Sequence, residues 1–265
     1  MKAFCKKDKI VALALVLALL GGWVMAAPYV ILNNGQRKTG VDIRKMSNGD
    51  VMLINEKGDS FTYTADQIQQ AVADKPAYFD KAVAALRAGN ADAAVTAFER
   101  VVSDYKGLEW DVRAMPYLAQ AYSAQGDYLK AERAFDKLFK SSPKLQDNPD
   151  LSVAYAEVLL RAKKMSTLDE QLSRMISSGD RKAAAYAQLM RGNIEFEKQD
   201  YKAAAKDYLR TVYFFRNQTD VMPEASFKLA EALDKMRDKR AKEWYATVVE
   251  QFPGSEYASK ARAKL

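Results

Sequence analysis

The stretch GDYLKAERAFDKLFKSSP, residues 126–143, combines a turn, an amphipathic helix and a helix-ending proline. Ala131 is followed four positions later by Phe135 and three positions after that by Leu138. Residues at these spacings share one face of an α-helix, and that face is predicted to be buried. The same pattern of a small residue, an aromatic or large residue four positions later and a third residue three positions after that recurs along the chain. This recurrence determines the predicted architecture.

The pattern recurs at intervals of 37, 37, 36 and 37 positions, starting at Ala94, Ala131, Leu168, Ala204 and Ala241. Four residues after each come Phe98, Phe135, Leu172, Tyr208 and Tyr245, and three further come Val101, Leu138, Met175, Thr211 and Val248. The pattern resembles the tetratricopeptide repeat, a helix–turn–helix of about 34 residues. The resemblance implies a mostly α protein, an α-solenoid of about five such repeats within residues 75–265 that ends in a capping helix.

Two copies depart from the repeat pattern. The third has Leu168 in place of the small residue and lacks the turn glycine, and the fifth, in the stretch DKMRDKRA, also lacks it. Small residues let the two helices of a hairpin approach closely, so the local curvature is least certain at the third copy.

Residues 27–74 follow a different pattern, with apolar and polar residues alternating around Asn-Gly and Lys-Gly turns. Such dipeptides favour tight hairpins, so we predict three or four antiparallel strands. Thr64 is expected to cap a helix that closes over the sheet. The segment resembles small SH3-like or SLA1-homology modules, and a structural cap on the helical domain is an equal alternative.

Residues 1–26 have the layout of a secretory signal peptide: four lysines against one aspartate, an apolar run, and small residues before Ala27. The alternative is an uncleaved anchor helix, since the run is long enough to span a bilayer. Cleavage is favoured because glycines and a proline interrupt the run. We therefore expect a periplasmic or secreted protein with no stable membrane insertion after cleavage.

The chemistry of the mature chain is restricted by two missing residue types. The protein has no histidine, and its one cysteine, Cys5, precedes the apolar run, where it cannot be the lipid-modified residue of a lipoprotein. The mature chain therefore has no disulfide, no His or Cys metal site and no nucleophile–histidine pair. We expect no enzyme activity, no cofactor and no metal site. Removing residues 1–26 lowers the net charge from +7 to +4, and no basic cluster indicates nucleic-acid binding.

In the repeat family, the first helix of each pair lines the concave groove of the superhelix. Mapping those positions onto this sequence gives a predicted protein-binding groove of aromatic, charged and amide side chains. Its members are Arg113, Tyr117, Gln120, Glu157, Arg161, Tyr186, Asn193, Glu197, Phe227 and Glu231.

The last two repeats are similar to those of bacterial envelope proteins of this family, including an outer-membrane-assembly lipoprotein and a periplasmic coordinator of the Tol–Pal system. The resemblance implies a periplasmic scaffold that binds a peptide or protein partner of the cell envelope in envelope assembly or maintenance. The alternatives are an accessory subunit or hydrolase of cell-wall metabolism, and self-association of the repeat array.

Overall fold

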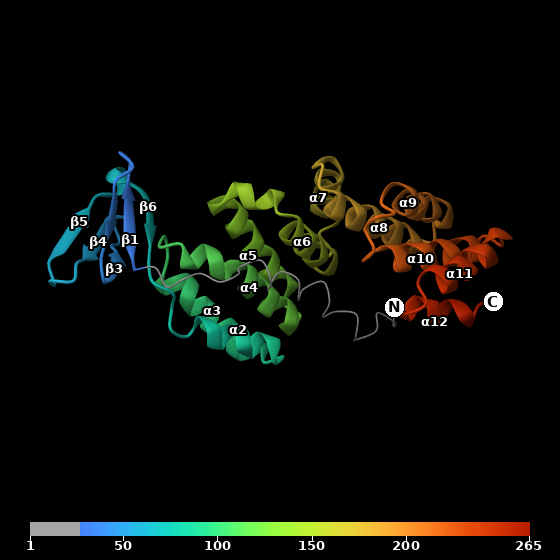
Figure 1. Ribbon diagram of the computed structural model, residues 1–265, viewed down its shortest axis with the longest axis horizontal. Helices are drawn as coiled ribbons and strands as arrows, with labels where there is room; N and C mark the ends of the chain where they lie inside the picture. Colours follow the sequence, from blue (N-terminus) through green and yellow to red (C-terminus); the bar gives the residue numbers. More distant parts are fainter. Residues whose placement is uncertain (1–26) are drawn as a thin grey trace. The chain divides into compact units, whose positions relative to one another are not determined.

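The computed structural model describes residues 27–265, in which short β-strands precede a series of α-helices (Figure 1). The predicted signal peptide, residues 1–26, lies outside the described residues. The strands are β1 (Tyr29–Leu32), β2 (Arg37–Thr39), β3 (Asp42–Lys45), β4 (Val51–Ile54), β5 (Ser60–Tyr63) and β6 (Ile68–Val72). The helices are α2 (Phe79–Arg87), α3 (Ala91–Asp104), α4 (Trp110–Gln125), α5 (Tyr128–Ser141), α6 (Pro149–Arg161), α7 (Met165–Ser177), α8 (Arg181–Glu197), α9 (Tyr201–Phe214), α10 (Met222–Lys235), α11 (Arg240–Gln251) and α12 (Glu256–Arg262).

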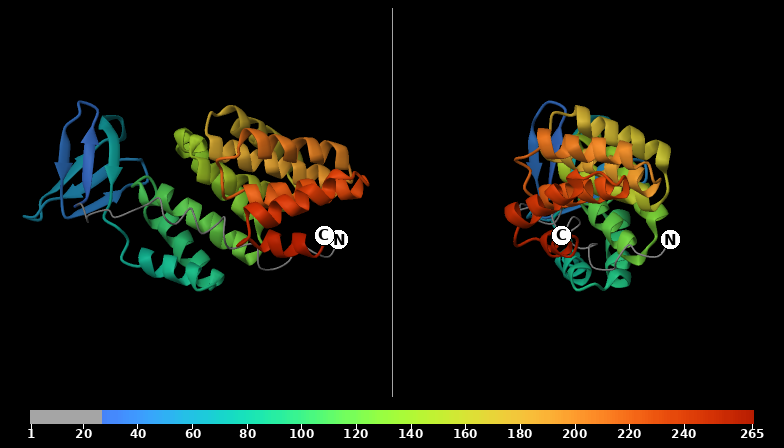
Figure 2. Two further views of the ribbon diagram at one scale, coloured as in Figure 1. Left: turned by 45° about the vertical axis from the view of Figure 1, so that its right-hand side comes forward. Right: turned by 90° about the vertical axis from the view of Figure 1, so that its right-hand side faces the viewer.

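The chain divides into two compact units. The first holds residues up to 146 together with 161–163, and the second holds 147–160 and 164–265. The first unit therefore contains the strands and the hairpins α2–α3 and α4–α5. The second contains the hairpins α8–α9 and α10–α11, most of α6–α7, and α12; the succession of hairpins can be followed in Figure 2.

The strands form two antiparallel sheets of three, with orders β2-β1-β6 and β3-β4-β5. In the first, Val30 lies opposite Lys38 on one side and Ala71 on the other; in the second, Leu53 lies between Ile43 and Phe61. Three of the turns carry glycines with positive φ, Gly35, Gly49 and Gly58, where the sequence predicted them. The predicted β-module is thus present as antiparallel strands joined by tight turns.

The predicted closing helix after Thr64 is wrong. Only one 3-10 turn, η2 (Ala65–Gln67), forms there, and the chain continues as β6. The capping signal is real, since the Thr64 backbone N–H donates to the Gln67 side chain at 3.2 Å. A helix does not follow because β6 pairs with β1 along its length and buries Ala71 and Val72. Pairing with a strand about forty residues earlier overrides the local helix signal.

The three recurring positions of the repeat pattern are buried in all five copies, which confirms the repeat phase. The first of the three positions, which is alanine in four copies and Leu168 in the third, is 0% exposed in the first four copies and 5% exposed in the last. The second and third positions are at most 3% exposed. They are the residues Ala94, Phe98, Val101, Ala131, Phe135, Leu138, Leu168, Leu172, Met175, Ala204, Tyr208, Thr211, Ala241, Tyr245 and Val248. Each second helix therefore turns the same face to its neighbours. The copy with Leu168 keeps this arrangement too.

Every hairpin turn contains a residue in the left-handed conformation, whether or not it is glycine. Gly89 and Gly126 occupy this place in the first two hairpins, and Lys163, Gln199 and Arg237 take it in the others, with φ of 60°, 64° and 55°. The missing glycines of the third and fifth copies therefore leave the turn geometry unchanged. The departure costs stability instead, since a side chain in this conformation is strained.

In the first unit an aromatic cluster lies where the β-module meets the helices. The Phe79 ring contacts the rings of Phe98, Trp110 and Tyr117 edge-on, at centroid distances of 5.6, 5.1 and 5.4 Å. The Trp110 indole N–H donates to the Ala73 carbonyl at 2.9 Å, just after β6. This buried hydrogen bond ties the end of the sheet to the start of α4.

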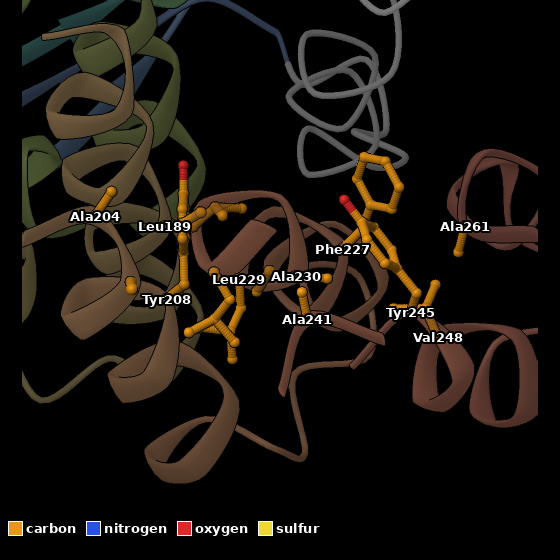
Figure 3. Close-up of a cluster of buried hydrophobic side chains, with 14 of the residues drawn as sticks. Leu189, Ala204, Tyr208, Phe227, Leu229, Ala230, Ala241, Tyr245, Val248 and Ala261 are labelled. Atoms are coloured by element: carbon orange, nitrogen blue, oxygen red, sulfur yellow. The ribbon is translucent and has the colours of Figure 1, made fainter. Parts of the chain in front are cut away.

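In the second unit a continuous core runs through α8 to α12 (Figure 3). Within it, Gly192 of α8 lies directly against the Tyr208 ring of α9; a Cβ at position 192 would lie 2.5 Å from Cε1. The ring is fully buried, and its hydroxyl donates to Asn193 Oδ1 at 2.8 Å. Glycine is therefore required here by close approach, because α8 and α9 are separated only by the ring.

The predicted capping helix is present as α12, with Ser255 as its N-cap and Ala258 and Ala261 fully buried. Leu265 lies beyond the helix and is exposed. Within residues 27–265, no helix combines the length and the apolar character needed to cross a bilayer.

Candidate protein-binding surface

The predicted groove residues all lie on the first helices of their hairpins. Within the first unit they lie on α4, and within the second on α6, α8 and α10; Arg161, the last residue of α6, groups with the first unit. The chain has two compact units, so the residues on α4 and the residues on α6, α8 and α10 form two separate groups.

Two of the predicted aromatic residues lie in the core. Tyr117 is 4% exposed and stacks on Phe98, with ring centroids 5.4 Å apart. Phe227 is 5% exposed and lies between the rings of Tyr245 and Tyr257, at 5.7 and 5.6 Å. Figure 3 shows the rings of Phe227 and Tyr245 side by side. These side chains hold hairpins together and present no open face to a partner.

On α4, Arg113 is committed to contacts within the protein. Its Nε donates to Glu109 Oε1 at 2.9 Å, and its guanidinium lies 5.0 Å from the centre of the Trp110 ring. The other carboxylate oxygen of Glu109 accepts from Gln70 Nε2 at 2.8 Å. Arg113 therefore supports the junction of β6 and α4. Gln120, seven residues later on α4, is half-buried.

The first helices repeat a pair of positions seven residues apart, which places both members on one helix face. The pairs are Arg113 and Gln120 on α4, Asp150 and Glu157 on α6, Tyr186 and Asn193 on α8, and Glu224 and Glu231 on α10. Successive pairs are 37, 36 and 38 residues apart, which matches the repeat. Four of the six positions in the second unit are carboxylates, so this face of α6, α8 and α10 is acidic.

Adjacent first helices in the second unit are joined through these positions. Lys182 Nζ of α8 donates to Asp150 of α6 at 2.7 Å. Asn193 Nδ2 of α8 donates to Glu224 of α10 at 3.2 Å, while its carbonyl accepts from Tyr208. The amide of Asn193 therefore links the buried tyrosine of α9 to a carboxylate on the neighbouring hairpin.

The carboxylates of this face contribute to the raised pKa values of two tyrosines, Tyr186 on α8 and the buried Tyr208 on α9, although burial is the first cause of both shifts. Burial, followed by the charges of Asp220 and Glu157, raises the pKa of Tyr186 to about 12. Burial, followed by Glu224 and Glu231, also raises the pKa of Tyr208 well above its usual range. With carboxylates at four of the six repeated positions, this face favours a cationic ligand over an anionic one.

The cations on this face are fewer than its carboxylates, and they are paired. Lys182 is bound to Asp150, and Lys228 is bound to Glu231 at 2.8 Å while lying 5.3 Å from the Phe196 ring. Glu197, at the end of α8, is exposed. The surface from α6 to α10 can thus accept hydrogen bonds from basic or amide groups of a partner.

Sequence reasoning missed Asp150 and Glu224, which occupy the same repeat position as Arg113 and Tyr186. They were overlooked because they lie in the first helical turn, where a carboxylate is common for its favourable interaction with the helix dipole. The seven-residue spacing to Glu157 and Glu231 is the signal that identifies them. In the described part of the chain, no group of three or more His, Cys, Asp or Glu residues is placed to hold a metal ion.

Comparisons with known proteins agree with this architecture. One tetratricopeptide-repeat family model matches residues 65–109 and 118–166, and a second matches residues 224–255. The structure of the apo form of RapI is similar with a TM-score of 0.59 and 14% identity, covering 69% of this chain and 73% of that one. A structure of MamA protein is similar with a TM-score of 0.51 and 16% identity, covering 65% and 88%. At such identities the likeness concerns the fold alone, and no curated protein matches the chain. The chain therefore carries tetratricopeptide repeats and folds as an α-solenoid, the architecture of a protein–protein interaction scaffold.

Proposed function

We propose that this chain is a non-catalytic scaffold of the bacterial periplasm, which binds an extended, basic segment of an envelope protein along α6, α8 and α10. The observation that carries the proposal is the repeated pair of positions on these helices, with carboxylates at four of six places. An extended segment meets equivalent positions on successive repeats, so a regular surface of this kind suits it.

The chemistry of the surface supports a partner with lysine, arginine or amide groups. Glu197 is open to solvent, Glu157 is half-buried, and the partly buried Tyr186 ring supplies apolar area. Charges arranged this way give specificity and fast association more than tight binding. Of the three predicted aromatic residues, Tyr186 is the one that is only partly buried, so it is the expected anchor.

The periplasmic location rests on residues 1–26, whose charged start, apolar run and small residues before Ala27 have the layout of a cleaved signal. The absence of a cysteine in residues 27–265 agrees with a protein that needs no disulfide in an oxidising compartment. Fractionation of cells and N-terminal sequencing test this part, with a mature start near Ala27 expected. A mature chain that begins at Met1, or one found in the cytoplasm, would contradict it.

The binding surface is tested by capture from periplasmic extract with the purified protein and its variants. Glu157→Gln with Glu197→Gln neutralises two carboxylates at constant size, and the amount of each captured protein is compared by mass spectrometry. Exposed ion pairs contribute about 0.2–1 kcal/mol each, so capture should weaken roughly two- to thirty-fold.

The matched control is Glu170→Gln with Glu250→Gln, which removes two exposed carboxylates from the second helices α7 and α11. We expect the control to capture the same proteins as the native chain. Equal loss in both double variants would show only an effect of net charge. Unchanged capture by the first variant would rule out this face as the binding site.

A further inference from the structure

A second surface of opposite charge lies on the second helices of the same unit. It is a pocket of about 480 Å³ lined by residues of α9, of the end of α10 and of the start of α11. These three helices are labelled in Figure 1. Its apolar lining comes from Ala205, Leu209, Leu233 and Met236. None of the groove residues predicted from the sequence contributes to it.

Along α9 the lining residues form two parallel rows. Ala205, Leu209 and Tyr213 follow at four-residue spacing in an apolar row, and Lys202, Lys206 and Arg210 do so in a basic row. Residues four apart stack above one another on a helix, so each row runs along the helix axis. From position 202 to 213 the surface extends roughly 17 Å, at 1.5 Å per residue.

Each row ends in a strongly exposed aromatic side chain, Tyr213 at the end of the apolar row and Phe214 after the basic row. Tyr213 and Phe214 are both 67% exposed, the highest values among the large hydrophobic side chains of the described residues. Met236, at the other side of the pocket, is exposed as well. Exposed apolar groups collected around one recess are characteristic of interaction sites.

The basic row is only partly neutralised. Arg210 pairs with Asp207 at 2.9 Å, and Arg240 on the far side pairs with Asp238 at 2.6 Å. Lys202 and Lys206 are exposed, and no carboxylate among residues 27–265 lies within ion-pair distance of either. The residues that line the pocket include no acid, and Lys202 and Lys206 supply its unpaired positive charge.

From these rows we infer that α9 docks an acidic amphipathic helix of a partner protein. Such a helix carries apolar side chains at four-residue spacing beside a row of Asp or Glu, and each row meets its complement on α9. The recessed part of the lining, at Ala205 and Leu233, accommodates inserted side chains, as in helix-in-groove recognition. The two surfaces of this unit differ in charge, so the partner helix and the basic segment proposed above are different ligands.

The test measures binding of a fluorescein-labelled designed helix of about fourteen residues, in which a Leu/Phe row adjoins a Glu row at four-residue spacing. We expect saturable binding to the purified protein that weakens as salt is added. Lys202→Glu with Lys206→Glu should weaken binding about ten-fold or more, because the charges then repel. Tyr213→Ser with Phe214→Ser should weaken it without changing the salt dependence.

Control variants and probes separate the alternatives. Lys242→Glu with Lys264→Glu reverses two exposed lysines outside the pocket and should leave affinity within about two-fold, since only screened long-range charge changes. Peptides with the apolar row changed to Ser, or with Lys in place of Glu, should bind at least about ten-fold more weakly.

Vesicles of phosphatidylglycerol in phosphatidylcholine test the other source of negative charge. If they bind through Lys202 and Lys206 while the peptide does not, the surface recognises lipid and the inference is wrong. It is also wrong if neither probe binds, or if peptide binding survives both pocket variants. Far-ultraviolet circular dichroism of each variant verifies that the helices are intact.

Discussion

Replacing Gly192 with alanine should destabilise the protein, although the same change in an ordinary helix is stabilising. Alanine is favoured over glycine within a helix by about 0.8–1.0 kcal/mol. Here the new Cβ would lie 2.5 and 2.6 Å from Cε1 and Cδ1 of Tyr208, about 1 Å inside normal carbon–carbon contact. The ring is fully buried and its hydroxyl is bonded to Asn193, so it has no free direction in which to move.

The magnitude follows from three opposing contributions. Overpacking of this kind costs about 1–3 kcal/mol, and displacing the ring would strain a hydrogen bond with a net contribution of about 0.5–1.5 kcal/mol. After the gain in helix propensity is subtracted, we expect Gly192→Ala to lower the free energy of unfolding by about 0.5–3.5 kcal/mol. Urea unfolding followed by circular dichroism measures the change.

A control and a double mutant make the test specific. Gly254 has an ordinary φ and nothing within 4 Å of the Cβ position, so Gly254→Ala should change stability by less than about 0.5 kcal/mol. In a background of Tyr208→Leu, Gly192→Ala should become neutral or stabilising, because the opposing ring is gone. If Gly192→Ala raises stability in the native background, the close packing of α8 against α9 is refuted.

Three further predictions concern stability. Lys164→Asp should raise the free energy of unfolding by about 0.5–2 kcal/mol in urea titrations, because α7 then begins with a side chain that can accept from its backbone N–H groups; an unchanged midpoint would contradict this. The hydroxyl of Tyr245 is buried without a hydrogen-bond partner, so Tyr245→Phe should leave the melting temperature unchanged or raise it. Tyr208→Phe should lower the melting temperature, because it removes the hydrogen bond to Asn193. A lower melting temperature for Tyr245→Phe than for Tyr208→Phe would refute these hydrogen-bond assignments. The pKa of Tyr186 is raised to about 12 from its ordinary value near 10, so the unfolded chain releases this proton first and the free energy of unfolding falls as pH rises from 10 to 12. The Tyr186→Phe variant should lose less stability over that window in pH-dependent thermal melts. Parallel curves for the two proteins would contradict the shift.

The repeat architecture was predictable because hairpin packing is encoded at short range. A small residue, an aromatic residue four positions later and a further apolar residue suffice to place one helix face in the core, and Ala131, Phe135 and Leu138 show this in the clearest copy. The turns were harder, since Lys163 and Arg237 adopt a conformation that their residue types do not favour. Tertiary packing of the two helices holds them there.

What the sequence did not predict depends on contacts between distant segments. The residues after Thr64 carry a helix-capping signal, but β1 supplies a strand partner and the segment becomes β6. Phe227 occupies a groove position in the repeat, yet α12 packs beside α10 and Tyr257 covers the ring. Local pattern assigns a residue to a helix face, and only the neighbouring element decides whether that face is open.

The indole of Trp110, held by the Ala73 carbonyl, gives the first unit a fluorophore of its own. Trp244, packed against the core of α8 to α12, gives the second unit another, and Trp23 lies outside the described residues. With Trp244→Phe, tryptophan emission from residues 27–265 would come from the first unit alone, and with Trp110→Phe from the second. Thermal unfolding followed by tryptophan fluorescence can then establish whether the two units unfold together or one after the other.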